Sequence, residues 1–238
     1  MPAKKVVIVI VEGPTDEDAL GVIFQQFFDK NTVRVKVIHG DITTERQVTT
    51  FNILNRITSI VQQSLREYKL HKTDLLRIIH LVDTDGAYIP DSYILFDEHA
   101  IKPVYSTTSI KTANPGGLVL RNQQKRENLT KLHNTQFVWK DIPYGVFYFS
   151  CNLEHVLYDL LNLTDGEKEK KALEFAKKYK NDIPAFLEFV RNSDFAVIDD
   201  YLSSWTFIKQ KLHSLGRYSN IGICFGNGNA ISAIENKT

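Results

Sequence analysis

Cysteine and long apolar runs are scarce in this 238-residue sequence. Its only cysteines, Cys151 and Cys224, are too few for a disulfide framework, so we expect a reducing, cytoplasmic environment. No apolar run approaches the roughly 20 residues of a membrane helix, and the first residues lack the layout of a signal peptide, so no membrane association is expected. The formal net charge is only +1, and overall charge therefore indicates no class of partner.

The apolar run from Val6 to Val11 consists of six β-branched residues and stops at Glu12. Such a run is typical of a strand buried on both faces, as in parallel sheets. Gly13-Pro14 breaks the strand, and Asp16 lies in the first turn of a helix, where the helix dipole favours acids. Because open α/β sheets place ligands at the carboxyl ends of their strands, Glu12 and Asp16 are candidate site residues.

A second apolar run, Leu75–Val82, repeats this pattern and ends in Asp83-Thr84-Asp85-Gly86. If the two strands are neighbours, their terminal carboxylates meet at one edge of the sheet. Carboxylates at one point repel one another unless cations lie among them, and hard divalent ions prefer such oxygen ligands. On this reasoning, Asp85→Asn is expected to leave the metal-free protein at least as stable. The candidate metal ligands are Glu12, Asp16, Asp83 and Asp85.

The first part of the chain predicts an α/β fold with a parallel sheet, because strands and helices alternate along it. The second strand alternates apolar residues with Arg34 and Lys36 and is expected near an edge of the sheet. Thr44 and Gln47 resemble a capping box for a long helix. The expected elements are a strand at Lys5–Val11, a helix at Asp16–Asp29, a strand at Val33–Ile38, a helix from Thr44 to about Leu70 and a strand at Leu75–Val82.

The whole sequence predicts an α/β domain over residues 1–162, with an insertion around 87–140, and a helical C-terminal extension over 163–238 that packs on it. Thr107–Gly117 is expected to be a polar loop, and the tail from Ile221 is not assigned. The helix from Leu153 begins with a plausible cap at Asn152. The further expected elements are a strand at Val104–Ser106, a helix at Leu118–Asn134, a strand at Gly145–Phe149, and helices at Glu167–Lys180, Ile183–Asn192 and Asp199–Leu215.

A strand ending in Glu-Gly-x-x-Asp, followed by a strand ending in Asp-x-Asp-Gly, resembles the Toprim domain over about residues 5–86. The resemblance implies that Glu12 is a metal ligand or general acid/base and that Asp83 and Asp85 bind Mg²⁺ or Mn²⁺. In the nuclease branch, which includes the OLD-type and RloB-like proteins, a second acid lies where Asp16 stands. Small proteins of that branch, including the RloB-like ones, also carry a late strand that ends in a small polar turn, followed by a glutamate on a helix. The segment from Phe147 to Glu154 is similar, although the usual proline is missing. Glu154 is therefore a further candidate catalytic residue, which with Asp16 would complete a second metal position.

The segment between His99 and Lys140 carries seven lysines or arginines against one acid, Glu127. Most charge runs are solvated faces, and that interpretation stays open here. Because a nuclease needs cations to hold phosphates, the segment is also a candidate for nucleic-acid binding. A lysine that stabilises transition-state charge is expected as well, with Lys209 and Lys211 as candidates. The candidate phosphate contacts are Arg121, Lys125, Arg126 and Lys131.

The sequence therefore leads to the hypothesis of a nuclease that uses two Mg²⁺ or Mn²⁺ ions to hydrolyse phosphodiester bonds of DNA or RNA. Resemblance to the nuclease branch adds phage defence or nucleic-acid processing as the expected role, and a protein partner or homo-oligomer stays open. One alternative is a haloacid-dehalogenase-like phosphatase, because Asp83-x-Asp85-Gly86 also fits its nucleophile motif; that motif normally follows the first strand of its sheet. The other is a non-catalytic Toprim protein that binds nucleic acid or a protein partner.

Overall fold

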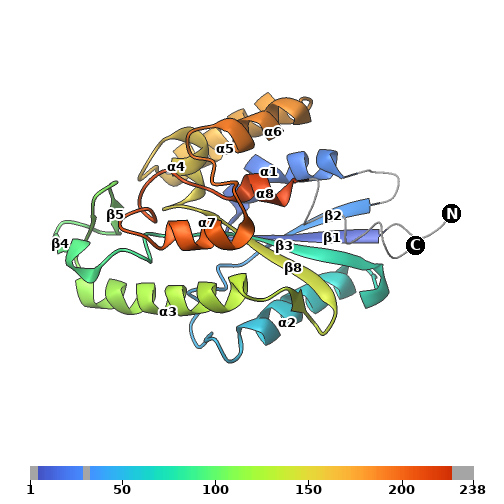
Figure 1. Cartoon of the computed structure of the whole chain (residues 1–238), viewed down its shortest axis with the longest axis horizontal. Helices are drawn as coiled ribbons and strands as arrows, with labels where there is room; N and C mark the ends of the chain where they lie inside the picture. Colours follow the sequence, from blue (N-terminus) through green and yellow to red (C-terminus); the bar gives the residue numbers. More distant parts are fainter. Residues whose placement is uncertain (1–4, 29–32, 227–238) are drawn as a thin grey trace.

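A five-stranded sheet lies at the centre of the computed structural model, which describes residues 5–28 and 33–226 (Figure 1). The strand order is β2-β1-β3-β8-β7. Strands β2, β1, β3 and β8 are parallel, and the short β7 pairs antiparallel with β8, so the sheet is mixed rather than wholly parallel. The bounds are β1 Lys5–Val11, β2 Val33–His39, β3 Leu75–Asp83, β7 Phe137–Val138 and β8 Ile142–Phe149.

The predicted strands of the sheet are confirmed closely. Val6 to Val11 are all buried, as a strand covered on both faces requires, and β1 has the predicted bounds. Strand β2 lies at the edge of the sheet, as its alternating pattern predicted. The strand predicted at Gly145–Phe149 begins slightly earlier, at Ile142. Because β8 is parallel to β3, its carboxyl end points the same way as those of β1 and β3.

Helices cover both faces of the sheet, and the alternation of β1 side chains divides the core in two. Val7, Val9 and Val11 pack toward α1, α5, α6 and α8, whereas Val6, Ile8 and Ile10 pack toward α2, α3 and α7. Figure 1 shows α1, α5 and α6 above the sheet and α2 and α3 below it. The helix bounds are α1 Pro14–Phe27, α2 Ile53–Glu67, α3 Pro115–His133, α4 Leu153–Tyr158, α5 Asp165–Tyr179, α6 Ile183–Asn192, α7 Tyr201–Ile208 and α8 Ile221–Cys224.

The prediction of a helix from Thr44 is wrong, since α2 begins only at Ile53. Asp41 accepts hydrogen bonds from the Thr43 hydroxyl and from the backbone and hydroxyl of Thr44. The Thr44 side chain is therefore used in a local turn around Asp41 and does not cap a helix. Aspartate side chains that bond the following backbone in this way favour turns over helices.

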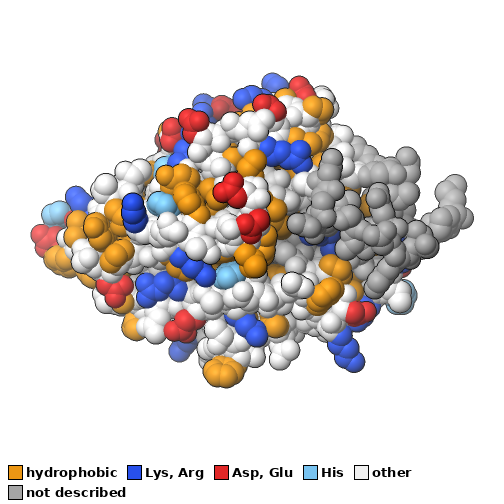
Figure 2. All heavy atoms as spheres, viewed as in Figure 1, with side chains coloured by type: hydrophobic (Ala, Val, Ile, Leu, Met, Phe, Trp, Pro, Cys, Tyr) orange, Lys and Arg blue, Asp and Glu red, His pale blue; other side chains and the backbone are white. Residues whose placement is uncertain are grey.

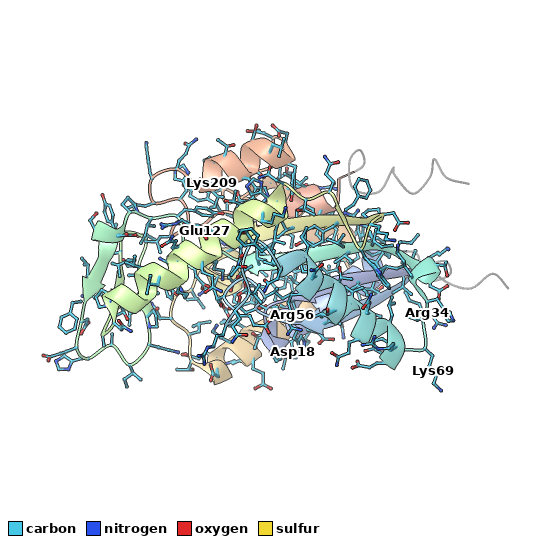
Figure 3. All side chains as sticks on the ribbon, turned by 90° about the horizontal axis from the view of Figure 1, so that it is seen from below. Asp18, Arg34, Arg56, Lys69, Glu127 and Lys209 are labelled. Carbon is cyan, nitrogen blue, oxygen red and sulfur yellow. The ribbon has the colours of Figure 1, made fainter. Side chains whose placement is uncertain are left out.

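The segment after β3 forms a second, three-stranded sheet with the order β4-β6-β5. Its strands are β4 Ile94–Phe96, β5 Val104–Tyr105 and β6 Ile110–Thr112, so the strand predicted near Val104 belongs to this small sheet and not to the central one. The predicted polar loop also contains β6. Two short 3₁₀ helices, η1 Lys72–Asp74 and η2 Asp91–Tyr93, complete the described elements. Seen from below, α3 extends from this small sheet toward α7 (Figure 3).

The C-terminal helices complete the central core instead of forming a separate one. Phe175 and Phe186, from α5 and α6, belong to the same cluster as Val7 and Val9. Helix α7 is shorter than the predicted helix at Asp199–Leu215, and the tail beyond residue 226 lies outside the described residues. Figure 2 shows basic and acidic side chains mixed over α5 and α6. Within residues 5–28 and 33–226, no helix combines the length and apolar character that crossing a membrane requires.

Candidate functional site

Acidic residues follow three neighbouring strands at the same edge of the sheet. Glu12 follows β1, Asp83 ends β3, and Glu154 lies in the first turn of α4, just after β8. The Asp83 backbone N–H donates a hydrogen bond of 3.1 Å to Glu12 Oε1, which joins the first two strand ends directly. The convergence predicted from the two motifs is therefore present in the structure.

The turn after β3 is fixed by hydrogen bonds to the turn after β8. Thr84 N–H donates to the Phe149 carbonyl at 2.9 Å, and Asp85 N–H donates to the Cys151 carbonyl at 2.8 Å. The Thr84 hydroxyl donates in turn to the Ser214 carbonyl at 3.0 Å. Gly86 has a φ of +65°, and a Cβ there would lie 2.6 Å from Leu215, so the turn requires glycine. These contacts hold Asp85 beside the end of β8.

Asp16 and Glu154 lie on the helices that follow β1 and β8. Asp16 is buried, and its Oδ2 accepts a 2.9 Å hydrogen bond from the Gly13 N–H at the start of α1. Glu154 is also buried, and the predicted cap at Asn152 is present, because its side chain accepts from the His155 N–H. Burial raises the pKa of Asp16 to about 6, and the nearby charge of Glu154 adds to the increase.

Burial and repulsion from neighbouring acids also raise the pKa values of Glu12 and Asp83. Burial raises the pKa of Glu12 from 4.5 to about 8, even though the charge of Lys125 opposes the increase. The pKa of Asp83 is also raised well above its usual range, first by burial and then by the charges of Glu12, Asp16, Asp85 and Glu154. A carboxyl group whose pKa is raised by the charges of four other acids lies near all four of them. Asp83 is therefore the central residue of the acidic edge.

Lys125 of α3 reaches into this acidic edge from the opposite layer. Its side chain is fully buried; its Nζ forms an ion pair with Asp85 Oδ2 and lies 3.3 Å from Glu12 Oε1. Burial would lower the pKa of Lys125, but the charges of Asp85, Glu12 and Asp41 outweigh burial and raise it. Lys125 was predicted as a phosphate contact on a solvated helix, and its position inside the protein differs from that prediction.

Two further cations accompany these acids. Arg121, one turn before Lys125, donates from Nη2 to the Asp85 carbonyl at 3.0 Å and from Nη1 to the Tyr105 hydroxyl at 3.1 Å. Its Nη1 is 3.7 Å from Asp85 Oδ2. On the other side, Lys168 of α5 pairs with Glu154 Oε1 at 2.8 Å and remains 31% exposed. Lysines and glutamates alternate along α5, a pattern that by itself is typical of an exposed charged face.

The other candidate cations lie away from the acids in the described contacts. Arg126 Nη1 is 3.9 Å from Asp91 Oδ1, and Lys131 is exposed near the end of α3. Lys209 bonds to His133 Nε2 at 2.8 Å, and Lys211 is exposed. Figure 3 shows Lys209 at the end of α7. Of the candidate cations predicted here, Lys125 and Arg121 thus lie among the carboxylates, whereas the described contacts place neither Arg126 nor Lys131 there.

Asp41 is a site neighbour that the sequence analysis did not identify. Burial would raise its pKa, but the charge of Lys125 and the hydrogen bonds from Thr44 and Thr43 outweigh burial and keep the pKa below its usual value. Asp41 therefore stays ionised and faces the same ammonium group as Glu12 and Asp85. The signal in the sequence was an acid two residues after the end of β2 at His39. Because β2 is parallel to β1, its carboxyl end lies at the same edge of the sheet as Glu12.

The donor chemistry of this edge fits a hard divalent cation, because Mg²⁺ and Mn²⁺ are bound by carboxylate oxygens. The side chains as they stand are not gathered for coordination: within residues 5–28 and 33–226, no three His, Cys, Asp or Glu side chains form a group able to hold a metal ion. Glu12, Asp85 and Glu154 instead pair with lysines. A metal ion can therefore bind to any of these three carboxylates only if that carboxylate turns away from its lysine partner.

Comparison with known proteins adds no assignment to this geometry. A scan against protein-family models, a search of curated proteins and a search of solved structures each found no match to the chain.

Proposed function

We propose that the chain is a divalent-metal-dependent nuclease of Toprim type, which hydrolyses phosphodiester bonds of DNA or RNA. The observation that carries the proposal is the meeting of Glu12, Asp83, Asp85 and Glu154 at the carboxyl ends of three neighbouring parallel strands. Ligand sites of open α/β sheets lie at this edge. Buried carboxyl groups with raised pKa values are also characteristic of functional sites.

The acids and cations of the edge have complementary tasks in this reaction. Asp83, with Asp16 and Glu154 beside it, would hold the divalent ion, which supplies Lewis acidity toward the phosphoryl oxygens. Glu12 has its pKa raised to about 8 and can therefore hold or release a proton near neutral pH, as a general acid or base must. Arg121 is 27% exposed beside Asp85, where its guanidinium can orient a phosphate.

The proposal is tested by incubating the full chain with labelled single- and double-stranded DNA and RNA in the presence of Mg²⁺ or Mn²⁺, with EDTA as the control. The expected result is cleavage of at least one substrate with metal and none with EDTA. Asp83→Asn should abolish this cleavage and Asp18→Asn should not, because Asp18 is an exposed residue of α1, labelled in Figure 3. Both variants replace one aspartate with asparagine, which makes them matched.

Two other outcomes would reject the proposal in different ways. Release of phosphate from small phosphoesters, without cleavage of any nucleic acid, would identify a phosphatase that uses the Asp83-x-Asp85 motif. Binding of nucleic acid without metal-dependent turnover would identify a non-catalytic binding protein. Because each outcome is measured with the same preparation, the assay separates the three functions.

A further inference from the structure

Lys125 stands at a core position of α3. Side chains at intervals of three and four residues form the buried stripe of this helix, and a lysine is unusual there because an unpaired buried ammonium is costly. Its fully buried Nζ contacts Asp85 Oδ2 and lies 3.3 Å from Glu12 Oε1, so the charge is paired on two sides. Among the buried residues of α3, this spacing joins Leu118, Asn122, Lys125, Leu129 and Leu132; Asn128 and His133 are buried beside them.

The acids that Lys125 joins are two of the expected metal ligands. An ammonium between Glu12 and Asp85 provides positive charge at a point where a divalent ion bridging them would stand. The side-chain Oδ1 of Asn122 accepts hydrogen bonds from Arg121 Nε at 3.2 Å and Nη2 at 2.7 Å, which hold the second cation beside Asp85. Helix α3 therefore places two positive charges, those of Lys125 and Arg121, on one side of the acidic edge.

The charge balance differs on the two sides of the edge. Beside Glu12, Asp85 and Asp41, the cations are Lys125 and Arg121, which leaves one negative charge when all three acids are ionised. Thr43 and Thr44 donate hydrogen bonds to Asp41 there. Beside Asp16, Asp83 and Glu154, the cation is Lys168, paired with Glu154. Among the described residues, no lysine or arginine forms an ion pair with Asp16 or Asp83. Two negative charges thus remain uncompensated there when all three acids are ionised, which one divalent ion would neutralise.

We propose that Lys125 replaces one of two divalent ions: its ammonium holds the position between Glu12 and Asp85, and the protein binds a single divalent ion at Asp83, Asp16 and Glu154. This inference rests on the proposed function and replaces the two ions expected from the sequence with one ion and a lysine. A second ion would have to displace a buried ammonium from two carboxylates, which leaves that ammonium without partners. The single ion displaces only the half-exposed Lys168 from Glu154.

The experiment counts bound Mn²⁺ on the EDTA-treated full chain, by calorimetry and by electron paramagnetic resonance of the free ion. The wild type is expected to bind one Mn²⁺ per chain. Lys125→Met should bind two, because the position between Glu12 and Asp85 becomes free while the methionine retains the apolar stem. Lys168→Met is the matched control and should still bind one, since it frees no second position.

Two aspartate variants locate the ion. Asp83→Asn should lose the single Mn²⁺, whereas Asp85→Asn should retain it, because Asp85 pairs with Lys125 and does not bind the ion. Circular dichroism verifies that each variant is folded, and the wild-type count decides the inference even if Lys125→Met does not fold.

The outcomes separate this inference from the proposed function. Two Mn²⁺ on the wild type, or one on folded Lys125→Met, would overturn the role of Lys125 and leave the nuclease proposal standing. Loss of the ion in Asp85→Asn but not in Asp83→Asn would also overturn the inference, since the ion would then occupy the position given to Lys125. No bound Mn²⁺ on the wild type, together with no metal-dependent cleavage, would reject both.

Discussion

Replacing Glu12 with glutamine should change how the stability of the metal-free protein depends on pH. Burial raises the pKa of Glu12 from 4.5 to about 8 in the folded protein. Between these two values the folded state holds a proton that the unfolded state has released, so the free energy of unfolding falls as pH rises. The stabilisation is complete below about pH 4.5 and is lost as pH increases toward the folded pKa of about 8.

The magnitude follows from the size of the shift. Each unit of pKa corresponds to about 1.4 kcal/mol, so the shift from 4.5 to about 8 represents roughly 5 kcal/mol in total. Of this, less than about 1 kcal/mol is lost by pH 5 and about 4 kcal/mol by pH 8, a difference of about 3 kcal/mol. Glutamine does not titrate, and its carbonyl can still accept the hydrogen bond from the Asp83 N–H. Glu12→Gln should therefore escape this loss.

The assay is urea unfolding in EDTA at pH 5 and pH 8. Relative to wild type, Glu12→Gln should gain about 3 kcal/mol of unfolding free energy between the two pH values. The control is Glu127→Gln, an exposed residue on α3 that is labelled in Figure 3; its difference from wild type should be the same at both pH values. Parallel pH profiles for wild type and Glu12→Gln would refute the raised pKa and the burial that is its main cause.

Three further predictions follow from the contacts of the site. Asp85→Asn should lower the unfolding free energy in EDTA by about 3 kcal/mol, because buried Lys125 loses its main partner; stability equal to wild type would restore the sequence-based expectation that repulsion dominates. Glu154→Gln should remain folded and lose nuclease activity by about a hundredfold, measured as initial rate, whereas near-normal cleavage would make Glu154 an ordinary helix-start acid. Neutralising Arg126 and Lys131 together should lower the salt dependence of nucleic-acid binding by about one unit of slope per contact; an unchanged slope would assign both to the solvated surface.

The sheet edge could be predicted because its signals are local. An unbroken β-branched run specifies a strand covered on both faces, and Glu12 or Asp83 directly at the end of such a run must lie at the edge of the sheet. Parallel crossovers then bring the ends of β1 and β3 together without further information. The same reasoning placed Glu154, since the strand before it is parallel to β3.

The cations of the site could not be predicted in the same way, because their positions depend on tertiary contacts. Lys125 and Asp85 are separated by 40 residues, and Lys125 and Glu12 by 113. A lysine in a polar helix is normally solvated, so Lys125 was grouped with Arg126 on one basic surface. A weak signal existed: Leu118, Lys125 and Leu132 repeat at seven-residue intervals, which places the lysine on the apolar side of α3.

The same spacing explains why the segment at 87–140 is more than an insertion into a complete domain. Leu129 and Leu132 of α3 fill the core beneath the sheet, and Lys125, on the same buried stripe, neutralises the acids at its edge. Packing and charge compensation therefore depend on one helix. Without α3, Glu12 and Asp85 would face each other and Asp41 with no ammonium between them, and the sheet would expose an apolar face. The β-α-β-α-β unit before Gly86 supplies most of the acids, but only α3 supplies the buried lysine that allows Glu12, Asp41 and Asp85 to lie together.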